Sequence, residues 1–89
     1  MTRHEIAEYK RLWKEGTIGI MGTSKVAHFM AKVYDEPSVY GINEGRISKL
    51  TIKVDGEVTL SYDRGWDIEP AEDDQITNTA LAILLNDYQ

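Results

Sequence analysis

The sequence predicts an α+β fold, in which a four-stranded, mainly antiparallel sheet carries N- and C-terminal helices packed on one face (order α-β-β-β-β-α). Apolar residues recur at helical spacing near both ends of the chain and with a period of two between them. Turn-forming residues, above all Asp55-Gly56, separate the apolar segments. A length of 89 residues fits a single domain, residues 1–89.

The first helix is expected at about Thr2–Glu15. Thr2 and Glu5 have the spacing of a capping box, in which each side chain bonds the other's free backbone N–H. Gly16 is a natural end for the helix. The apolar stripe of this helix consists of Ile6, Tyr9, Leu12 and Trp13.

The first strand begins at Thr17, and the second runs from about Val26 to Tyr34. A four-residue loop at 22–25 places Ile20 opposite Ala27 and Ile18 opposite Phe29. The apolar residues of both strands then face the same side, which a slip of one residue would prevent.

A loop at 35–45 leads to the third strand, about Arg46–Val54, and the fourth strand is about Glu57–Tyr62. A two-residue Asp55-Gly56 turn would put the apolar rows of these strands on opposite faces. A three-residue loop at 54–56, with Gly56 as a left-handed bulge residue, pairs Lys53 with Glu57, Ile52 with Val58 and Leu50 with Leu60. We therefore expect the three-residue loop.

The last helix is expected at about Ala71–Asn86, after a polar loop at 63–70. Pro70 suits the first turn of a helix. The core stripe is formed by Ile76, Ala80, Ile83 and Leu84. Leu81 and Leu85 make the stripe wider than one sheet face needs. They either pack in the core of the same chain or form the seam of a homo-oligomer.

Composition excludes several classes of function. The net charge is −5, with 10 Lys and Arg against 15 Asp and Glu, so direct nucleic-acid binding is not expected. There is no cysteine and there are only two histidines, which leaves too few ligands for a zinc site. No cofactor motif and no catalytic motif is present, so an enzyme is not expected. The apolar run 81–85 is too short to cross a membrane, and the chain is expected in the cytoplasm.

Two loops combine aromatic and charged residues, as interface hot spots do. Each leaves a strand through a Tyr-Asp step. The candidate binding residues in and beside them are Asp35, Glu36, Tyr40, Arg46, Asp63, Arg64, Trp66 and Asp67. In the structural alternative, Trp66 and Ile68 cap the core and Arg64 pairs with Asp35 or Asp63.

Four segments, WxxGTI, AKVYDEPS, YGIxxGRISKL and YDRGWD, begin at Trp13, Ala31, Tyr40 and Tyr62, where x marks a position outside the pattern. Together they resemble a small family of uncharacterised proteins from Firmicutes genomes, their phages and mobile elements. The resemblance spans about Trp13 to Leu85. It implies a context and carries no known activity or catalytic residues.

That context implies a non-enzymatic binding protein that antagonises a bacterial defence system. In the first form, acidic residues of the two loops and the last helix dock on a basic surface of a host defence protein, such as a CRISPR nuclease. In the alternative form, an oligomer sequesters a nucleotide immune signal, with Arg64 and Arg46 on the phosphate and Trp66 or Tyr40 on the base. A third form is an accessory protein of a mobile element with no role in immunity.

Overall fold

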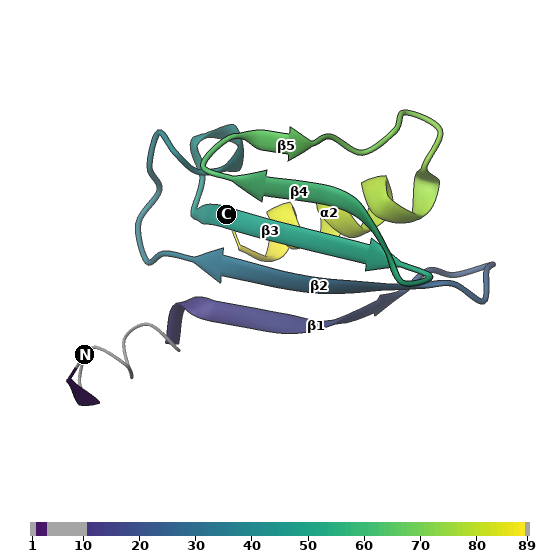
Figure 1. Ribbon diagram of the computed structural model, residues 1–89, viewed down its shortest axis with the longest axis horizontal. Coiled ribbons are helices and arrows are strands. Elements are labelled where there is room, and N and C mark those ends of the chain that lie inside the picture. The colour runs from purple at the N-terminus through teal and green to yellow at the C-terminus, as the bar shows by residue number, and fades with distance from the viewer. Residues whose placement is uncertain (1, 4–10, 89) are drawn as a thin grey trace.

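The computed structural model describes residues 2, 3 and 11–88. Five strands form one antiparallel sheet, in which each strand pairs with its neighbours in the sequence: β1 Trp13–Gly19, β2 Val26–Val33, β3 Ile47–Val54, β4 Glu57–Asp63 and β5 Trp66–Ile68. The helix α2, Gln75–Asp87, lies across one face of the sheet, behind β3 in Figure 1. The other face is turned toward the viewer, and no described helix covers it. We call this side the open face.

The predicted four-stranded sheet with two packed helices is wrong. β5 adds a fifth strand inside the expected loop at 63–70, and β1 begins at Trp13, so residues 13–15 belong to a strand and not to a helix. Residues 4–10, with Glu5 and most of the predicted first helix, lie outside the described residues. The one complete α-helix in the described part of the chain is the C-terminal α2.

Helix α2 starts at Gln75 and not at Ala71, because Asp74 is its N-cap. The Asp74 carboxylate accepts a hydrogen bond from the Thr77 N–H at 3.0 Å. Such a cap satisfies one of the backbone donors that the first turn of a helix leaves without a partner. The acidic residues before Asp74 therefore form a turn outside the helix.

The core lies between α2 and the sheet. Its centre is formed by side chains that are at most 1% exposed, among them Leu50, Ile52, Leu60, Ala80 and Leu84. Leu81 and Leu85 are half-buried and pack against this core. For these two residues the structure favours packing within the chain over an exposed oligomer seam.

The first hairpin keeps the predicted faces and changes the pairing. Ile18 lies opposite Ala27 and Gly16 opposite Phe29, and the connection covers residues 20–25. The predicted loop at 22–25 and its pairs are therefore wrong by a shift of two residues. Because the shift is even, the apolar side chains still face the core. A Cβ on Gly16 would lie 3.2 Å from the Phe29 ring, so glycine lets that ring approach β1 closely.

The second hairpin has a two-residue turn. Asp55 and Gly56 both have positive φ, 53° and 78°, as a type I′ turn requires, and Val54 pairs with Glu57. The predicted three-residue loop and its Lys53–Glu57 pair are wrong.

A bulge in β4 restores the match between the faces. Lys53 pairs with Val58, but Ile52 pairs with Leu60, so Thr59 is the extra residue. Leu50 consequently lies opposite Tyr62, and the predicted Ile52–Val58 and Leu50–Leu60 pairs are wrong. The extra residue that brings the apolar side chains of β3 and β4 onto one face therefore lies inside β4 and not in the turn.

The bulge also connects the sheet to the helix. The hydroxyl of Thr77, which is fully buried on α2, is hydrogen-bonded to Thr59 Oγ1 at 2.7 Å and to Asp74 Oδ2 at 2.6 Å. Burying a hydroxyl costs free energy unless it is hydrogen-bonded, and here Thr59 and Asp74 are the hydrogen-bond partners of the Thr77 hydroxyl. This small network fixes the start of α2 against β4.

Candidate functional site

The two Tyr-Asp loops meet at one end of the sheet, the left end in Figure 1. The Tyr62 hydroxyl donates a hydrogen bond to the Tyr40 carbonyl at 2.8 Å, and the Arg64 N–H donates to the Ser48 carbonyl at 2.9 Å. A cleft of about 830 Å³ lies here, lined by residues of both loops and by the adjoining ends of β2 and β3. We call it the end cleft.

The loop at 34–46 forms one wall of the end cleft and is folded against the core. Ile42 is 2% exposed and anchors it. The Ser38 N–H donates to the Gly45 carbonyl at 3.1 Å, which closes the loop on itself. A Cβ on Gly41 would lie 2.0 Å from the Gly45 carbonyl oxygen, so only glycine fits there. The wall of the cleft is therefore held in a defined shape.

Tyr40 is presented from this wall. Its ring is among the exposed hydrophobic groups, with 59% of the residue accessible. Its backbone is held on both sides: the N–H donates to Ser38 Oγ at 3.2 Å, and the carbonyl accepts from Tyr62. The main chain of Tyr40 is thus fixed while its ring lines the cleft.

Two lysines lie directly opposite each other at the base of the end cleft. Lys32 on β2 and Lys49 on β3 are cross-strand partners, and both line the cleft. Like charges in this position repel each other and destabilise a sheet. A bulge at Ser48 adjoins the pair, because the pairing moves from Lys32–Lys49 to Val33–Ile47. Bulges of this kind often redirect side chains beside functional sites.

Arg64 adds a third cation to the end cleft. It occupies the tight turn between β4 and β5 with a φ of 57°, a left-handed conformation that is uncommon for arginine. Asp63 lies 3.8 Å from both the Arg64 and the Lys49 side chains, which remain 70% and 40% exposed. These long, exposed ion pairs are weak, and a ligand anion can compete with them.

Arg11 and Asp35 form a bidentate ion pair across the mouth of the cleft, with both N–O distances at 3.0 Å. The hydrogen bond and the charge of Arg11 lower the pKa of the Asp35 carboxyl below its ordinary value. Asp35 is therefore ionised and paired with Arg11, and the other charged side chains that line the cleft are Lys32, Glu36, Lys49 and Arg64.

The predicted binding residues separate into two groups. Asp35, Glu36, Tyr40 and Arg64 line the end cleft. Four others do not: Asp63 contacts its cations from outside, the Arg46 Nε donates to the Tyr88 carbonyl at 3.1 Å, and Trp66 and Asp67 lie on β5.

Trp66 packs edge-on against Tyr62, with ring centroids 5.0 Å apart. It therefore caps one end of the core and remains 40% exposed. Arg64 pairs with Asp63, whereas Asp35 is taken by Arg11. The contacts of Trp66 and Arg64 within the chain are therefore those of the structural alternative, in which Trp66 caps the core and Arg64 pairs with Asp63.

Sequence reasoning missed Lys32, Lys49 and Tyr34, which also line the cleft. The outward direction of Lys32 and Lys49 could be predicted, since each alternates with apolar neighbours. Their pairing could not, because the long loop between β2 and β3 does not determine which residues of the two strands lie opposite each other.

Three further observations concern only the part of the chain that the structure describes. A second hollow of about 590 Å³ lies on the open face, lined by His28, Phe29, Met30 and neighbours on β1 and β3. No group of three His, Asp or Glu side chains in residues 2–3 and 11–88 is arranged to hold a metal ion. Nor does this part of the chain contain a helix of the length and apolarity that a membrane crossing requires.

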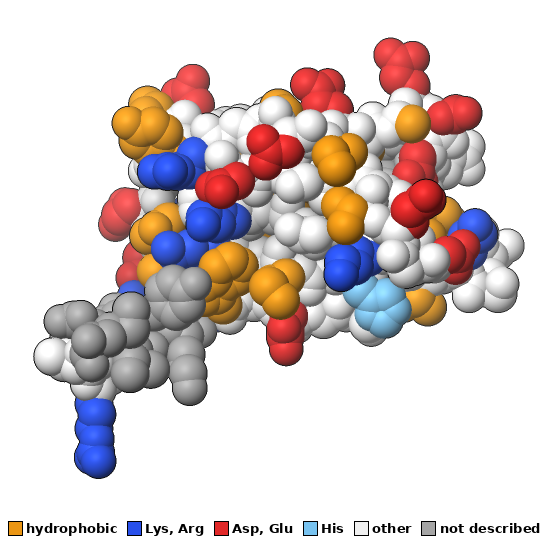
Figure 2. All heavy atoms as spheres, in the orientation of Figure 1, with side chains coloured by type: hydrophobic (Ala, Val, Ile, Leu, Met, Phe, Trp, Pro, Cys, Tyr) orange, Lys and Arg blue, Asp and Glu red, His pale blue; other side chains and the backbone are white. Residues whose placement is uncertain are grey.

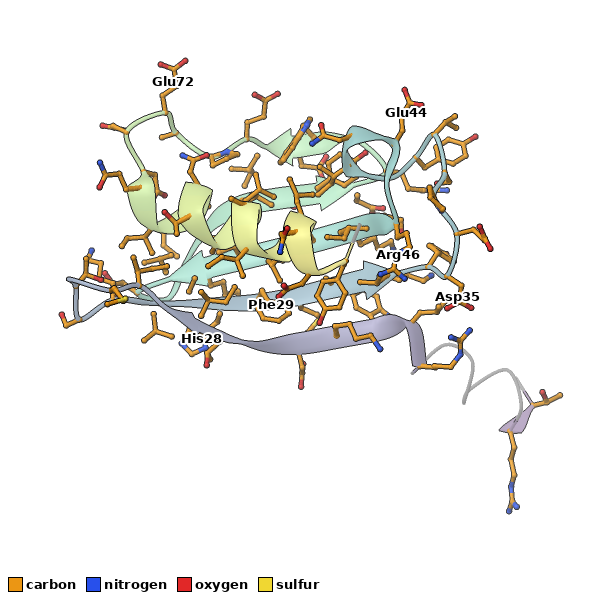
Figure 3. All side chains as sticks on the ribbon, turned by 180° about the vertical axis from the view of Figure 1, so that it is seen from behind. His28, Phe29, Asp35, Glu44, Arg46 and Glu72 are labelled. Carbon is orange, nitrogen blue, oxygen red and sulfur yellow. The ribbon has the colours of Figure 1, made fainter. Side chains whose placement is uncertain are left out.

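Figure 2 shows the charge distribution on the open face. Basic side chains gather toward the end cleft, and acidic side chains follow the upper edge. From behind, Asp35 and Arg46 lie at the end of the molecule that holds the cleft, and Glu72 lies at the far end (Figure 3). Cationic side chains therefore gather at the end that holds the cleft, beside the carboxylates of Asp35 and Glu36, and the upper edge is acidic, in a chain with a net charge of −5.

A family model described as a domain of unknown function (DUF7678) matches residues 12–89. No curated protein and no solved structure matches the chain.

Proposed function

We propose that this chain, which belongs to the DUF7678 family of domains of unknown function, is a non-enzymatic binding protein that holds an anionic ligand in its end cleft. The main observation in support of this proposal is the cross-strand pair Lys32–Lys49, with Arg64 in the same cleft. Protein sites that bind phosphates or carboxylates are built from such convergent cations. An anion between the two lysines would offset the repulsion between their like charges.

The shape of the end cleft supports the same proposal. Its volume of about 830 Å³ falls in the range of small-molecule sites, roughly 300–1,000 Å³. Its described lining includes four hydroxyls, of Tyr34, Ser38, Tyr40 and Ser48, and the carboxylates of Asp35 and Glu36, but neither a histidine nor a cysteine. Histidine and cysteine are the side chains that most often supply acid-base or thiol catalysis, and the Asp35 carboxylate is already paired with Arg11, so we take the cleft as a binding site.

The proposal can be tested with pyrophosphate as the probe, by isothermal titration calorimetry at low and moderate salt. Lys49→Gln is expected to weaken binding roughly tenfold, because it removes one charge-assisted contact. The matched control is Lys53→Gln, which removes an exposed charge from the same strand outside the end cleft. Binding should also weaken as salt rises.

Two results would contradict the proposal. One is the absence of any pyrophosphate binding at low salt. The other is equal weakening by Lys49→Gln and Lys53→Gln, since that would mean that the probe senses only the overall charge of the face.

A second candidate function is an anti-defence inhibitor of phage or mobile-element origin, acting in the cytoplasm of the host cell. Its support is the acidic edge, formed by the exposed residues Asp67, Glu69, Glu72 and Asp73. A run of like charge on one edge complements a basic surface, such as the nucleic-acid groove of a CRISPR nuclease or another immune effector.

This second candidate is tested by a pull-down from host lysate with the double variant Glu72→Gln, Asp73→Asn beside the native chain. A partner should be retained at low salt by the native chain and lost with the double variant. Glu57→Gln, an exposed change at the other hairpin, is the control. Retention of the same proteins by all three chains would exclude the acidic edge as the contact surface.

A further inference from the structure

The end cleft combines two chemistries, cations at its base and aromatic rings on its wall. We infer that its ligand is a nucleoside phosphate, with the phosphates against Lys32, Lys49 and Arg64 and the base against Tyr40. This inference rests on the proposed function, since it names the kind of anion that the cleft holds. It also places the ligand within one chain and not between subunits.

The aromatic wall has features that simple anion binding does not need. Tyr34 and Tyr40 both line the cleft, and they are 39% and 59% exposed. Exposed rings beside a cationic groove are the arrangement by which proteins stack bases while holding phosphates. Because the backbone of Tyr40 is already fixed by Ser38 and Tyr62, stacking there requires little further ordering of the chain.

The two tyrosines differ in the faces that they offer. The Lys32 ammonium lies 5.2 Å from the centroid of the Tyr34 ring, in a cation–π arrangement that occupies one face of that ring. No described cation is placed over Tyr40 in this way. We therefore assign the base to Tyr40 and the role of supporting Lys32 to Tyr34.

The surroundings disfavour a longer nucleic acid. The acidic edge begins at β5, directly after the turn that carries Arg64, so phosphates that continue past the cleft in that direction would meet Asp67 and Glu69. Such a strand would also have to bind a chain with a net charge of −5. A mononucleotide avoids both difficulties because its charge ends within the cleft.

The test compares four nucleoside diphosphates (ADP, GDP, CDP and UDP) with pyrophosphate and an eight-nucleotide single strand by calorimetry. At least one nucleoside diphosphate is expected to bind about tenfold tighter than pyrophosphate, because a stacked base adds to the anion contacts. Tyr40→Ala should remove that advantage, so that on this variant a nucleoside diphosphate binds no tighter than pyrophosphate does. Tyr40→Phe, which keeps the ring, should restore it.

The outcomes separate the two levels of the argument. Equal affinity for pyrophosphate and all four nucleotides overturns the nucleotide inference and leaves the anion-binding function intact. Tighter binding of the eight-nucleotide strand than of any mononucleotide overturns it in favour of a nucleic-acid ligand. If the native chain does not bind pyrophosphate at all, the proposed function is overturned together with this inference.

Discussion

Replacing Tyr62 by phenylalanine tests the link between the core and the end cleft. The Tyr62 side chain starts in the core, at 7% exposure, and its hydroxyl donates to the Tyr40 carbonyl at 2.8 Å. Phenylalanine keeps the ring and its edge-on contact with Trp66 while removing this single bond. The substitution therefore isolates the attachment of the loop from the packing beneath it.

The expected loss of stability follows from the geometry. A neutral hydrogen bond contributes about 0.5–1.5 kcal/mol net to folding, and a carbonyl left without a partner in a dry site costs more. Because this hydrogen bond is only part-buried, water can partly replace the lost donor, so the loss should be about 1 kcal/mol. For a domain of this length, that lowers the melting temperature by roughly 4–8 °C.

Urea unfolding followed by tryptophan fluorescence measures this difference directly. Tyr34→Phe is the matched control, because it removes a hydroxyl from an exposed ring at the same cleft. Tyr62→Phe should also weaken nucleotide binding more than Tyr34→Phe, since the Tyr40 wall loses its attachment. Equal unfolding free energies for the two variants would show that the Tyr62–Tyr40 bond does not fix the loop, and the argument for a preformed site would fail.

Three further predictions concern the scaffold and its charges. Thr77→Val should destabilise the fold by about 1–3 kcal/mol in urea unfolding, because it removes the hydrogen bonds of a fully buried hydroxyl to Thr59 and Asp74; an unchanged midpoint would contradict this role. Gly56→Ala should cost about 1–2 kcal/mol in the same assay, since φ there is 78° while nothing lies within 4 Å of the new Cβ; a neutral effect would mean that the turn rearranges freely. Arg11→Gln should raise the pKa of Asp35 toward its ordinary value in a carboxyl NMR titration. Because the pKa of Asp35 is lowered in the folded protein, its ionised form stabilises the fold at pH values above the unfolded pKa. This stabilisation is lost as the pH falls through the folded pKa, so the variant should lose less stability on acidification than the native chain.

The sequence predicted the central strands and the last helix because their local signals are strong. Alternation locates β2, β3 and β4 to within a residue or two, and the apolar stripe locates α2. At the N-terminal side, Leu12 and Trp13 continue the helical spacing of the preceding residues, although Trp13 already belongs to β1. Gly16 was interpreted as a helix end, whereas its role is to accept the Phe29 ring, a contact that no local pattern reveals.

β5 and the bulges depend on tertiary context. Three residues at the edge of a sheet carry too few positions for a period to be recognised, and the left-handed Arg64 before them contradicts its own propensity. A three-residue turn and a bulge at Thr59 would each bring the apolar side chains of β3 and β4 onto the same face of the sheet. Only the packing of Thr59 against Thr77 distinguishes them.

Four of the eight candidate binding residues line the end cleft, and the sequence offers them because they are charged or aromatic residues on loops. The cationic base of the cleft was missed, since it lies on strands and depends on the alignment of β2 with β3. A search for outward-facing lysines on neighbouring strands would have named both members of the pair but not their apposition.

The β1–β2 connection offers a practical handle. Met21 is 97% exposed at the tip of that hairpin, at the end of the sheet opposite the cleft (Figure 1). The native chain has no cysteine, so Met21→Cys would introduce its single thiol. A dye or a solid support attached there would leave the end cleft facing outward, which suits both fluorescence titrations and oriented capture of candidate ligands from cell extracts.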